Sequence, residues 1–467
     1  MQANKKKLIT TGLLLATLPA AIFAAKTIID IRKGAAGTPA SFTIDASRTM
    51  GPITRALWQN LAQGGEEPTD MIGPVAKLLR PLEVKLIRVD HLFDYYQVFQ
   101  GPGNYDFSRL DQVVNSIVAV GAKPMLSLSY TTASMAKNGQ NAGEPADWNQ
   151  WYELVKATAR RYSIDKGISG IYYEVWNEPD LFGGWHYGKS PSYTTLYIQS
   201  ARAVMNGAGG SNYKLGGPAT TALYTNWIKS ILSTAASNNL RLDFISWHRY
   251  SKNIDDFEKD FDTLNGLLYD YPQFFNVEKI ITEAGPNPEP DSWYDNSLSA
   301  SHLISLSIRL SGRIHKMFTF EAVDGPSPRS DKSTGWGIIK HSSQGGQPKP
   351  ASRYAALLFL NRLQGQRLYS IGDGSWVTSF STKNNQTIQT LIANYDPRHN
   401  HSKSVPIRYQ NLTPGNYKLT VTNFPGGRTS NRTISVAAPT YQFNPERTDP
   451  LFYLEPNTSL LLELTPQ

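Results

Sequence analysis

Cysteine is absent from the 467 residues of the chain. Its absence excludes a disulfide framework, a thiolate metal site and a thiol nucleophile. Histidine is scarce, at eight residues, and none of the eight is paired at a ligand spacing such as His-Glu-x-x-His. We therefore predict that the protein uses neither a metal ion nor a cofactor.

Charged residues are also few, at 18% of the chain, and they leave a net charge of +8. The basic residues are scattered rather than gathered into runs with stacking aromatics, so we predict no nucleic-acid partner. Aromatic residues are plentiful, with 10 Trp and 24 Tyr. Their flat faces suit contact with sugar rings, although core packing accounts for most of them.

The N-terminus has the pattern of an export segment. Three lysines at positions 5–7 precede an apolar stretch that runs to Ala25. The residues three places before the possible cleavage points, Ile22 and Phe23, are not small. Residues 1–25 are therefore either a signal peptide or an uncleaved membrane anchor, and we expect the protein to be secreted or extracytoplasmic.

The chain is longer than one hydrophobic core usually supports, so we expect two domains. Across residues 52–345, short β-rich runs alternate with longer amphipathic stretches, which predicts a parallel sheet built from repeated βα units. Eight such units match a (β/α)8 TIM barrel, whose active residues lie at the carboxyl ends of the strands. The expected strands are Ala56–Trp58, Val84–Val89, Pro124–Ser129, Ile171–Trp176, Lys214–Gly217, Phe244–Trp247, Lys279–Thr282 and Lys316–Phe320.

Residues 346–467 change in character. A helix-like run from Ala351 to Leu363 comes first, and short alternating strands separated by Asn, Gly and Pro turns follow. This pattern predicts a C-terminal antiparallel β-sandwich domain. Residues 26–51 are expected to be a linker followed by a strand that crosses back to join the sandwich.

Two glutamates end predicted barrel strands. Glu178 stands in Asn177-Glu178-Pro179 at the end of the fourth strand, and Glu283 ends the seventh. Each alone is compatible with a solvated strand-end turn. In a closed barrel, however, both project from the same rim, where a pair of carboxylates can cleave a glycosidic bond. A gap of about 5 Å between them implies retention of configuration, and a wider gap implies inversion.

These motifs carry a family resemblance. YEVWNEPDLF, YKLGGPAT, LDFISWHRY and IITEAGPN resemble, in order and spacing, glycoside hydrolase family 39, which contains β-xylosidases and α-L-iduronidases within clan A of retaining (β/α)8 glycosidases. The resemblance implies that Glu178 is the general acid/base and Glu283 the nucleophile of a double displacement. It also implies that Asn177 binds the sugar 2-hydroxyl.

Other residues near the predicted strand ends are candidates for substrate binding. Arg88 could supply the positive charge that keeps Glu283 ionised, or form a structural ion pair. The resemblance places His248 and Tyr250 beside the nucleophile, although both could instead be core residues. The remaining candidates are two polar residues just past Arg88 and two loop tryptophans that could stack on sugar or pack in their loops, namely Asp90, His91, Trp185 and Trp336.

Where the family often has a Glu-Leu-Gly-Phe run at the third strand, this chain has Ser127-Leu128-Ser129-Tyr130, so a polar contact in the site is altered. Arg249 is the cation at hand for a uronic acid, but strand alternation turns it away from the barrel interior. The sequence therefore leaves the sugar, the linkage and the oligomeric state open. Alternative functions are a non-catalytic carbohydrate-binding or adhesion protein and an endo-acting exopolysaccharide hydrolase.

Overall fold

The computed structural model describes residues 37–64, 68–324, 335–340, 347–443 and 453–467. They form two compact units, one of residues 52–365 with the short stretch 424–427, and one of the remaining described residues. The predicted export segment, 1–25, lies outside the described residues. Within the part that is described, no helix has the length and apolar character needed to cross a bilayer.

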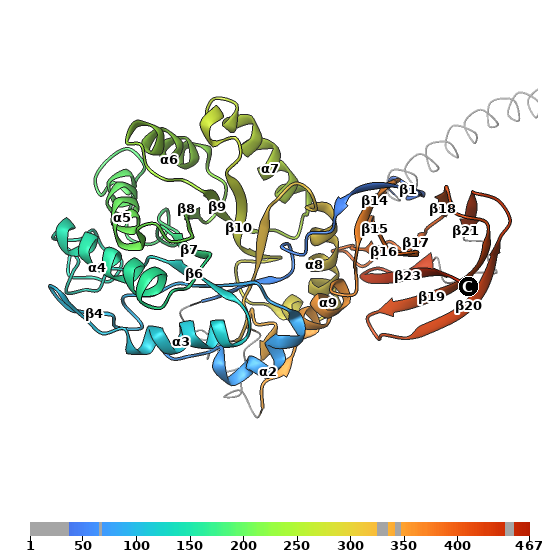
Figure 1. Ribbon diagram of the computed structural model, residues 1–467, viewed down its shortest axis with the longest axis horizontal. Helices are drawn as coiled ribbons and strands as arrows, with labels where there is room; N and C mark the ends of the chain where they lie inside the picture. Colours follow the sequence, from blue (N-terminus) through green and yellow to red (C-terminus); the bar gives the residue numbers. More distant parts are fainter. Residues whose placement is uncertain (1–36, 65–67, 325–334, 341–346, 444–452) are drawn as a thin grey trace, which may run out of the picture. The chain divides into compact units, whose positions relative to one another are not determined.

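The larger unit is a closed barrel of eight parallel strands arranged in chain order, with helices on its outside (Figure 1). This confirms the predicted (β/α)8 barrel. The strands are β2 (Asn60–Gln63), β3 (Leu86–Val89), β6 (Lys123–Ser127), β7 (Ile171–Glu174), β8 (Tyr213–Thr220), β9 (Phe244–Tyr250), β10 (Glu278–Gly285) and β11 (Lys316–Phe320). The helices are α2 (Ala76–Leu79), α3 (Ser108–Ala119), α4 (Trp148–Arg160), α5 (Tyr193–Ala208), α6 (Thr225–Ser237), α7 (Asp255–Leu268), α8 (Ser297–Arg309) and α9 (Ser352–Leu360).

The outer helices form where capping residues precede an apolar stripe. Helix α4, for example, begins after Asp147, whose carboxylate accepts a hydrogen bond of 2.8 Å from the backbone N–H of Asn149. Its buried face carries Trp151, Leu154 and Val155 at helical spacing. Such helices cover the outer face of the sheet and leave the barrel mouth to the strand ends and loops.

The first barrel strand differs from the prediction. Ala56–Trp58 forms a turn, and the strand is Asn60–Gln63 instead. Leu57 and Trp58 of that turn are buried without being extended, whereas the polar side chain of Gln63 has partners for both its donor and its acceptor. Its amide donates to the carbonyl of Val323 and accepts from the N–H of the same residue, both at 3.0 Å. A strand with internally satisfied polar residues gives little apolar signal in the sequence.

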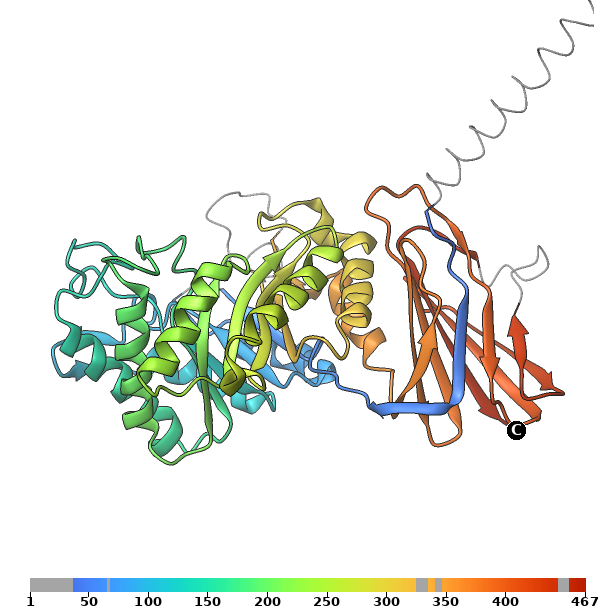
Figure 2. The ribbon, with the colours of Figure 1, turned by 90° about the horizontal axis from the view of Figure 1, so that it is seen from above.

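The smaller unit contains one nine-stranded sheet, and its strands contribute to a single apolar core. Strand β1 lies among strands from the other end of the chain (Figure 2), where it pairs in parallel with β18. Strands of the sheet are β1 (Phe42–Pro52), β14 (Gln366–Ile371), β15 (Val377–Asn384), β16 (Thr387–Asn394), β18 (Ile407–Gln410), β19 (Gly415–Phe424), β20 (Thr429–Val436), β21 (Tyr441–Phe443) and β23 (Thr458–Pro466). Short ladders complete the two units: β4 (Phe99–Gly101) with β5 (Asn104–Tyr105), β12 (Ile339–Lys340) with β13 (Lys349–Pro350), and β17 (Lys403–Ser404) with β22 (Tyr453–Leu454).

The boundary between the units falls at Gly365 and Gln366, later than the predicted start of the second domain at 346. Helix α9 therefore belongs to the barrel unit. Buried Arg353 on this helix donates a 2.8 Å hydrogen bond to the carbonyl of Phe320, the last residue of β11. That bond ties the helix to the end of the eighth strand and explains its place in the barrel unit.

Two glycines inside helices give opposite expectations for the same substitution. A Cβ on Gly207 of α5 would lie 2.3 Å from the carbonyl oxygen of Lys156 on α4, whereas a Cβ on Gly266 of α7 would meet nothing within 4 Å. We predict that Gly207→Ala destabilises the protein by about 1–3 kcal/mol through overpacking. Gly266→Ala is the control and should stabilise it by about 0.5–1 kcal/mol through helix propensity. Chemical denaturation measures both, and equal effects would contradict the close packing of α4 on α5.

Candidate active site

The site lies where the inward-facing residues of the barrel strands change from apolar to polar. Below it, one layer of apolar side chains fills the barrel, including Leu86, Tyr172 and Phe244. Because side chains alternate along a strand, the residues two positions further on face the same interior. Those positions are occupied by Arg88 after Leu86 and by Glu174 after Tyr172. The polar cluster is thus the next layer of the barrel toward the carboxyl ends.

Arg88 is the centre of this cluster and is fully buried. Its Nε donates to Glu174 at 2.6 Å, one terminal nitrogen donates to Glu283 at 3.0 Å, and the other donates to Asn177 at 2.7 Å. These acceptors come from β7, the loop after it, and β10. Arg88 therefore forms the structural ion pair and also contacts the predicted nucleophile, so both interpretations of this residue describe real contacts.

Glu178 is held in an unusual backbone conformation. Its φ is +47° and that of Trp176 is +73°, both in the left-handed region that non-glycine residues seldom adopt. The turn is fixed by a hydrogen bond of 2.9 Å from the N–H of Glu178 to the carbonyl of Ala219. The next turn of the loop is anchored by Asp180, which accepts from the N–H of Thr221 at 3.0 Å. The barrel thus determines where the Glu178 side chain points.

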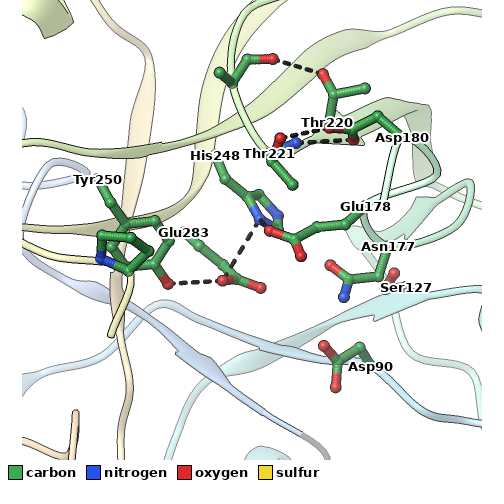
Figure 3. Close-up of polar contacts among 12 residues, drawn as sticks. Asp90, Ser127, Asn177, Glu178, Asp180, Thr220, Thr221, His248, Tyr250 and Glu283 are labelled. Atoms are coloured by element: carbon green, nitrogen blue, oxygen red, sulfur yellow. Dashed lines mark hydrogen bonds and ion pairs between the residues drawn. The ribbon is translucent and has the colours of Figure 1, made fainter. Parts of the chain in front are cut away.

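Glu283 is aimed by a bulge in strand β10. Pairing with β9 runs from Ile281 opposite Trp247 directly to Glu283 opposite His248, which skips one residue of β10. The hydroxyl of Tyr250 donates to Glu283 at 2.8 Å (Figure 3), on the carboxylate oxygen that Arg88 does not contact. Each oxygen of Glu283 thus has its own donor, which fixes the orientation of the carboxylate.

His248 lies between the two glutamates. Its Nδ1 is 2.8 Å from Glu178 and 3.5 Å from Glu283, and its Nε2 is buried with no hydrogen-bond partner in the described part of the chain. Donor atoms of Glu178, His248 and Glu283 all lie within 4.8 Å of one another. The geometry of such a group could also suit a divalent cation.

The amide of Asn177 has a fixed orientation. Its Oδ1 accepts from Arg88, so its Nδ2 must be the atom that donates to the hydroxyl of Tyr130 at 2.7 Å. That hydroxyl donates in turn to the backbone carbonyl of Asn177 at 3.1 Å. Because an amide nitrogen carries two hydrogens, one remains for a ligand. Tyr130, in the run that departs from the family pattern, therefore supports Asn177.

Asp90 and His91 follow β3 and have different surroundings. Asp90 is buried, with Oδ2 3.7 Å from Arg88 and no hydrogen-bond partner for Oδ1 among the described residues. The ring of His91 stacks on Tyr95 at 4.1 Å between centroids and pairs with Asp94 at 2.9 Å. The structure thus places Asp90 in the cluster, while His91 pairs within its own loop and packs edge-on against Tyr130, with centroids 4.7 Å apart.

The two candidate tryptophans also differ. Trp185 is buried and packs edge-on against Trp176, with centroids 5.3 Å apart, as the loop-packing alternative describes. Trp336 is partly exposed and packs on Phe320, 5.6 Å away, against the same apolar layer as Tyr250. Trp336 therefore stays a candidate for sugar contact. Arg249 points outward to Asp260 of α7, as expected from strand alternation.

Burial and neighbouring charge shift several pKa values. Burial raises the pKa of Glu283 above its ordinary value, and the opposing charges of His248 and Arg88 do not cancel this effect. Burial alone lowers the pKa of His248, but Glu283 and Glu178 outweigh it and raise the pKa overall. Burial and the charge of Glu283 raise the pKa of Tyr250 well above its ordinary value, so Tyr250 stays a donor at every physiological pH.

Sequence reasoning missed Glu174, although it is the residue closest to Arg88. It lies inside an apolar run, IYYEVW, where a lone carboxylate is expected to be paired if it is buried. Alternation from Tyr172 would have directed it into the barrel. A buried acid within a predicted strand was thus the available signal.

Comparisons with known proteins agree with this arrangement. Residues 44–307 match the family described as Glycosyl hydrolases family 39. A β-xylosidase of Geobacillus stearothermophilus is 26% identical over 305 residues, 58% of each chain, and one of Caldicellulosiruptor saccharolyticus is 24% identical over 329 residues, 63% of this chain and 64% of that relative. The match thus spans about three fifths of the length of these relatives.

Solved structures share the fold. A family 39 enzyme from Xanthomonas axonopodis pv. citri superposes with a TM-score of 0.72 at 20% identity, covering 92% of this chain and 98% of that one. A monomeric β-xylosidase from Caulobacter crescentus gives 0.71 at 20% identity, with 91% and 99% covered. At this identity the likeness concerns the fold alone.

The buried charges of the cluster make a stability prediction. Arg88→Ala would leave Glu174 and Glu283 buried without their cation, so we expect a loss of about 3–5 kcal/mol in the free energy of unfolding. The control is Arg160→Ala, which removes an exposed arginine 3.5 Å from Asp165 and should cost about 0–1 kcal/mol. Urea titration compares the two. Similar losses would show that the buried network is not a stabilising constraint.

Proposed function

The chain belongs to glycosyl hydrolase family 39, and from this premise we propose that it is a retaining glycoside hydrolase acting on β-xyloside-like bonds of oligo- or polysaccharides. The observation that carries the proposal is the approach of Glu178 and Glu283, whose carboxylate oxygens come within 4.8 Å of each other. Retaining glycosidases hold their carboxyls about 5–5.5 Å apart, whereas inverting enzymes need about 6.5–9.5 Å to admit a water.

In the proposed first step, Glu283 attacks the anomeric carbon while Glu178 gives its proton to the departing glycosidic oxygen. The bond from carbon to the leaving oxygen breaks as the ester to Glu283 forms. In the second step, Glu178 takes a proton from water, the water oxygen attacks the same carbon, and Glu283 leaves as a carboxylate. Each residue thus returns to its starting state.

The neighbours of the pair support these roles. Tyr250 donates a hydrogen bond to one carboxylate oxygen of Glu283 and Arg88 donates to the other. Together they hold the carboxylate in a fixed orientation for attack. His248 Nδ1, at 2.8 Å from Glu178 and 3.5 Å from Glu283, holds the two carboxyl groups toward the same space.

Asn177 and Trp336 are proposed to position the sugar. The second N–H of the Asn177 amide is available to the 2-hydroxyl, a contact that strengthens as charge develops at the anomeric centre. Trp336 offers an aromatic face beside the apolar layer under Tyr250. We also propose that the nine-stranded sheet is a two-layered sandwich and that the protein acts outside the cytoplasm, as its basic and apolar N-terminal pattern predicts.

The catalytic pair is tested with an aryl β-xyloside. Glu178→Ala and Glu283→Ala should each lower turnover by about 10²–10⁴-fold, because each removes a group that acts only in the transition state. Azide should rescue both variants with opposite products. The Glu283 variant should give the azide of inverted configuration, and the Glu178 variant the azide of retained configuration.

Product stereochemistry is read by NMR. Glu153→Ala, which changes a partly exposed side chain of helix α4 that pairs only with Lys156 of the same helix among the ion pairs of the described residues, is the control and should keep normal activity. Full activity in both active-site variants would overturn the proposal, and identical azide products would overturn the assignment of the two roles.

The pH dependence of activity should reflect the ionisation of Glu283. Only the ionised form of Glu283 attacks, so activity falls as the pH drops through the pKa of this residue. Because that pKa is raised, the fall in activity at low pH (the acid limb of the profile) should lie above the ordinary pKa of glutamate, about 4.3. Tyr250→Phe removes a hydrogen bond to the carboxylate and should move the limb to still higher pH. Tyr172→Phe, which loses a similar 2.9 Å bond to Glu278, is the control and should not move it. Profiles of kcat/KM measure the limb, and equal shifts in both variants would count against Glu283.

A further inference from the structure

Asp90 carries a buried oxygen that the protein itself does not satisfy. Its side chain is almost fully buried, Oδ2 is 3.7 Å from Arg88, and Oδ1 has no hydrogen-bond partner among the described residues. Burial raises the pKa of Asp90, and the opposing charges of His91 and Arg88 do not cancel this effect. A buried acceptor of this kind calls for a donor from outside the chain.

The position of Asp90 shows where that donor would come from. It lies two residues after Arg88, so strand alternation turns both side chains to the barrel interior. Figure 3 shows Asp90 next to Asn177, in the same close-up as Glu178 and Glu283. A sugar held between the two glutamates would therefore bring its ring hydroxyls toward Asp90.

The charges around this space are unfavourable to an anionic sugar. The carboxylates of Glu283 and Asp90 border it, and the cations that contact them already have partners within the protein. Arg88 donates hydrogen bonds to Glu174, Glu283 and Asn177. His248 lies between Glu178 and Glu283 and contacts both.

The nearby rim cations in the described part of the chain also face acids. His91 pairs with Asp94 at 2.9 Å. Lys252 lies 3.8 Å from Asp291 and over the ring of Trp293. A substrate carboxylate placed beside Asp90 would meet like charge without a partner of its own.

We propose that Asp90 accepts a hydrogen bond from a ring hydroxyl of the substrate and that its charge restricts the enzyme to neutral sugars, against uronic acids. This inference rests on the proposed glycosidase function and names its substrate class. Asp90 is a specificity-determining residue in this role, because it contacts a hydroxyl away from the bond that is cleaved.

The hydroxyl contact is tested with substrate analogues. Aryl β-xyloside is compared with its 3-deoxy and 4-deoxy forms, in the wild type and in Asp90→Ala. In the wild type, loss of the hydroxyl that binds Asp90 should lower kcat/KM by about 10- to 100-fold, the value of a hydrogen bond to a charged group. In Asp90→Ala the same deletion should have little effect. A purely structural role for Asp90 would instead lower kcat/KM equally for every analogue, and that result would overturn the proposal.

The charge effect is tested with Asp90→Asn, which keeps the size of the side chain. The ratio of kcat/KM for an aryl β-glucuronide to that for the aryl β-xyloside should rise by about tenfold or more. Asp94→Asn is the matched control, since Asp94 is a buried acid of the same loop that faces His91 and the N–H of Tyr130. An unchanged ratio in Asp90→Asn, or the same rise in Asp94→Asn, would overturn the restriction to neutral sugars.

Binding separates this inference from the proposed function. The affinity of an S-linked aryl thio-β-xyloside and its deoxy forms is measured by calorimetry, which needs no hydrolysis. If the wild type cleaves no aryl glycoside but loses affinity for one deoxy form in an Asp90-dependent way, the proposed function fails and the role of Asp90 stands. If hydrolysis is normal and neither rates nor affinities depend on Asp90, only the role of Asp90 fails.

Discussion

The buried guanidinium of Arg88 is the constraint on which the site depends. A cation with no access to water must be surrounded by acceptors, and here they are supplied by Glu174, Glu283 and Asn177. The same contacts that compensate the charge also fix the positions of Glu283, the proposed nucleophile, and of the amide beside Glu178, the proposed acid/base. The buried charge of Arg88 thus determines both the stability of the folded barrel and the geometry of the site. A substitution that alters the contacts of Arg88 therefore changes both.

Strand geometry explains how side chains distant in sequence meet around that charge. Alternation directs Phe244, His248 and Tyr250 of β9 to the interior and sends Arg249 outward to α7. The bulge in β10 then turns Glu283 toward the same space. Glu178 reaches it from a left-handed turn rather than from a strand. The site is therefore built from one regular pattern and two local departures from it.

Much of this could be predicted from the sequence, because apolar runs ending in polar residues mark the carboxyl ends of barrel strands. Glu178, Asn177 and Glu283 carried that signal, and so did Arg88. The first strand, Asn60–Gln63, did not, since its polar side chains are satisfied by contacts that no local pattern shows. For Trp185 the sequence left sugar stacking and loop packing open, because it does not distinguish an exposed ring from a buried one. The partners of Arg88 needed the register between strands, which appears only in the folded barrel.

Strand β1 has a consequence for how the chain is made. Asp45, within β1, accepts a hydrogen bond from Asn411, 366 residues later in the chain, and its neighbours in the sheet are β14 and β18. During synthesis, residues 42–51 leave the ribosome before any of their partners exist, while the βα units that follow can close onto one another as they emerge. The first strand of the described residues is thus among the last to be paired, and its exposed edge must be tolerated, or covered by a chaperone, until the final strands arrive.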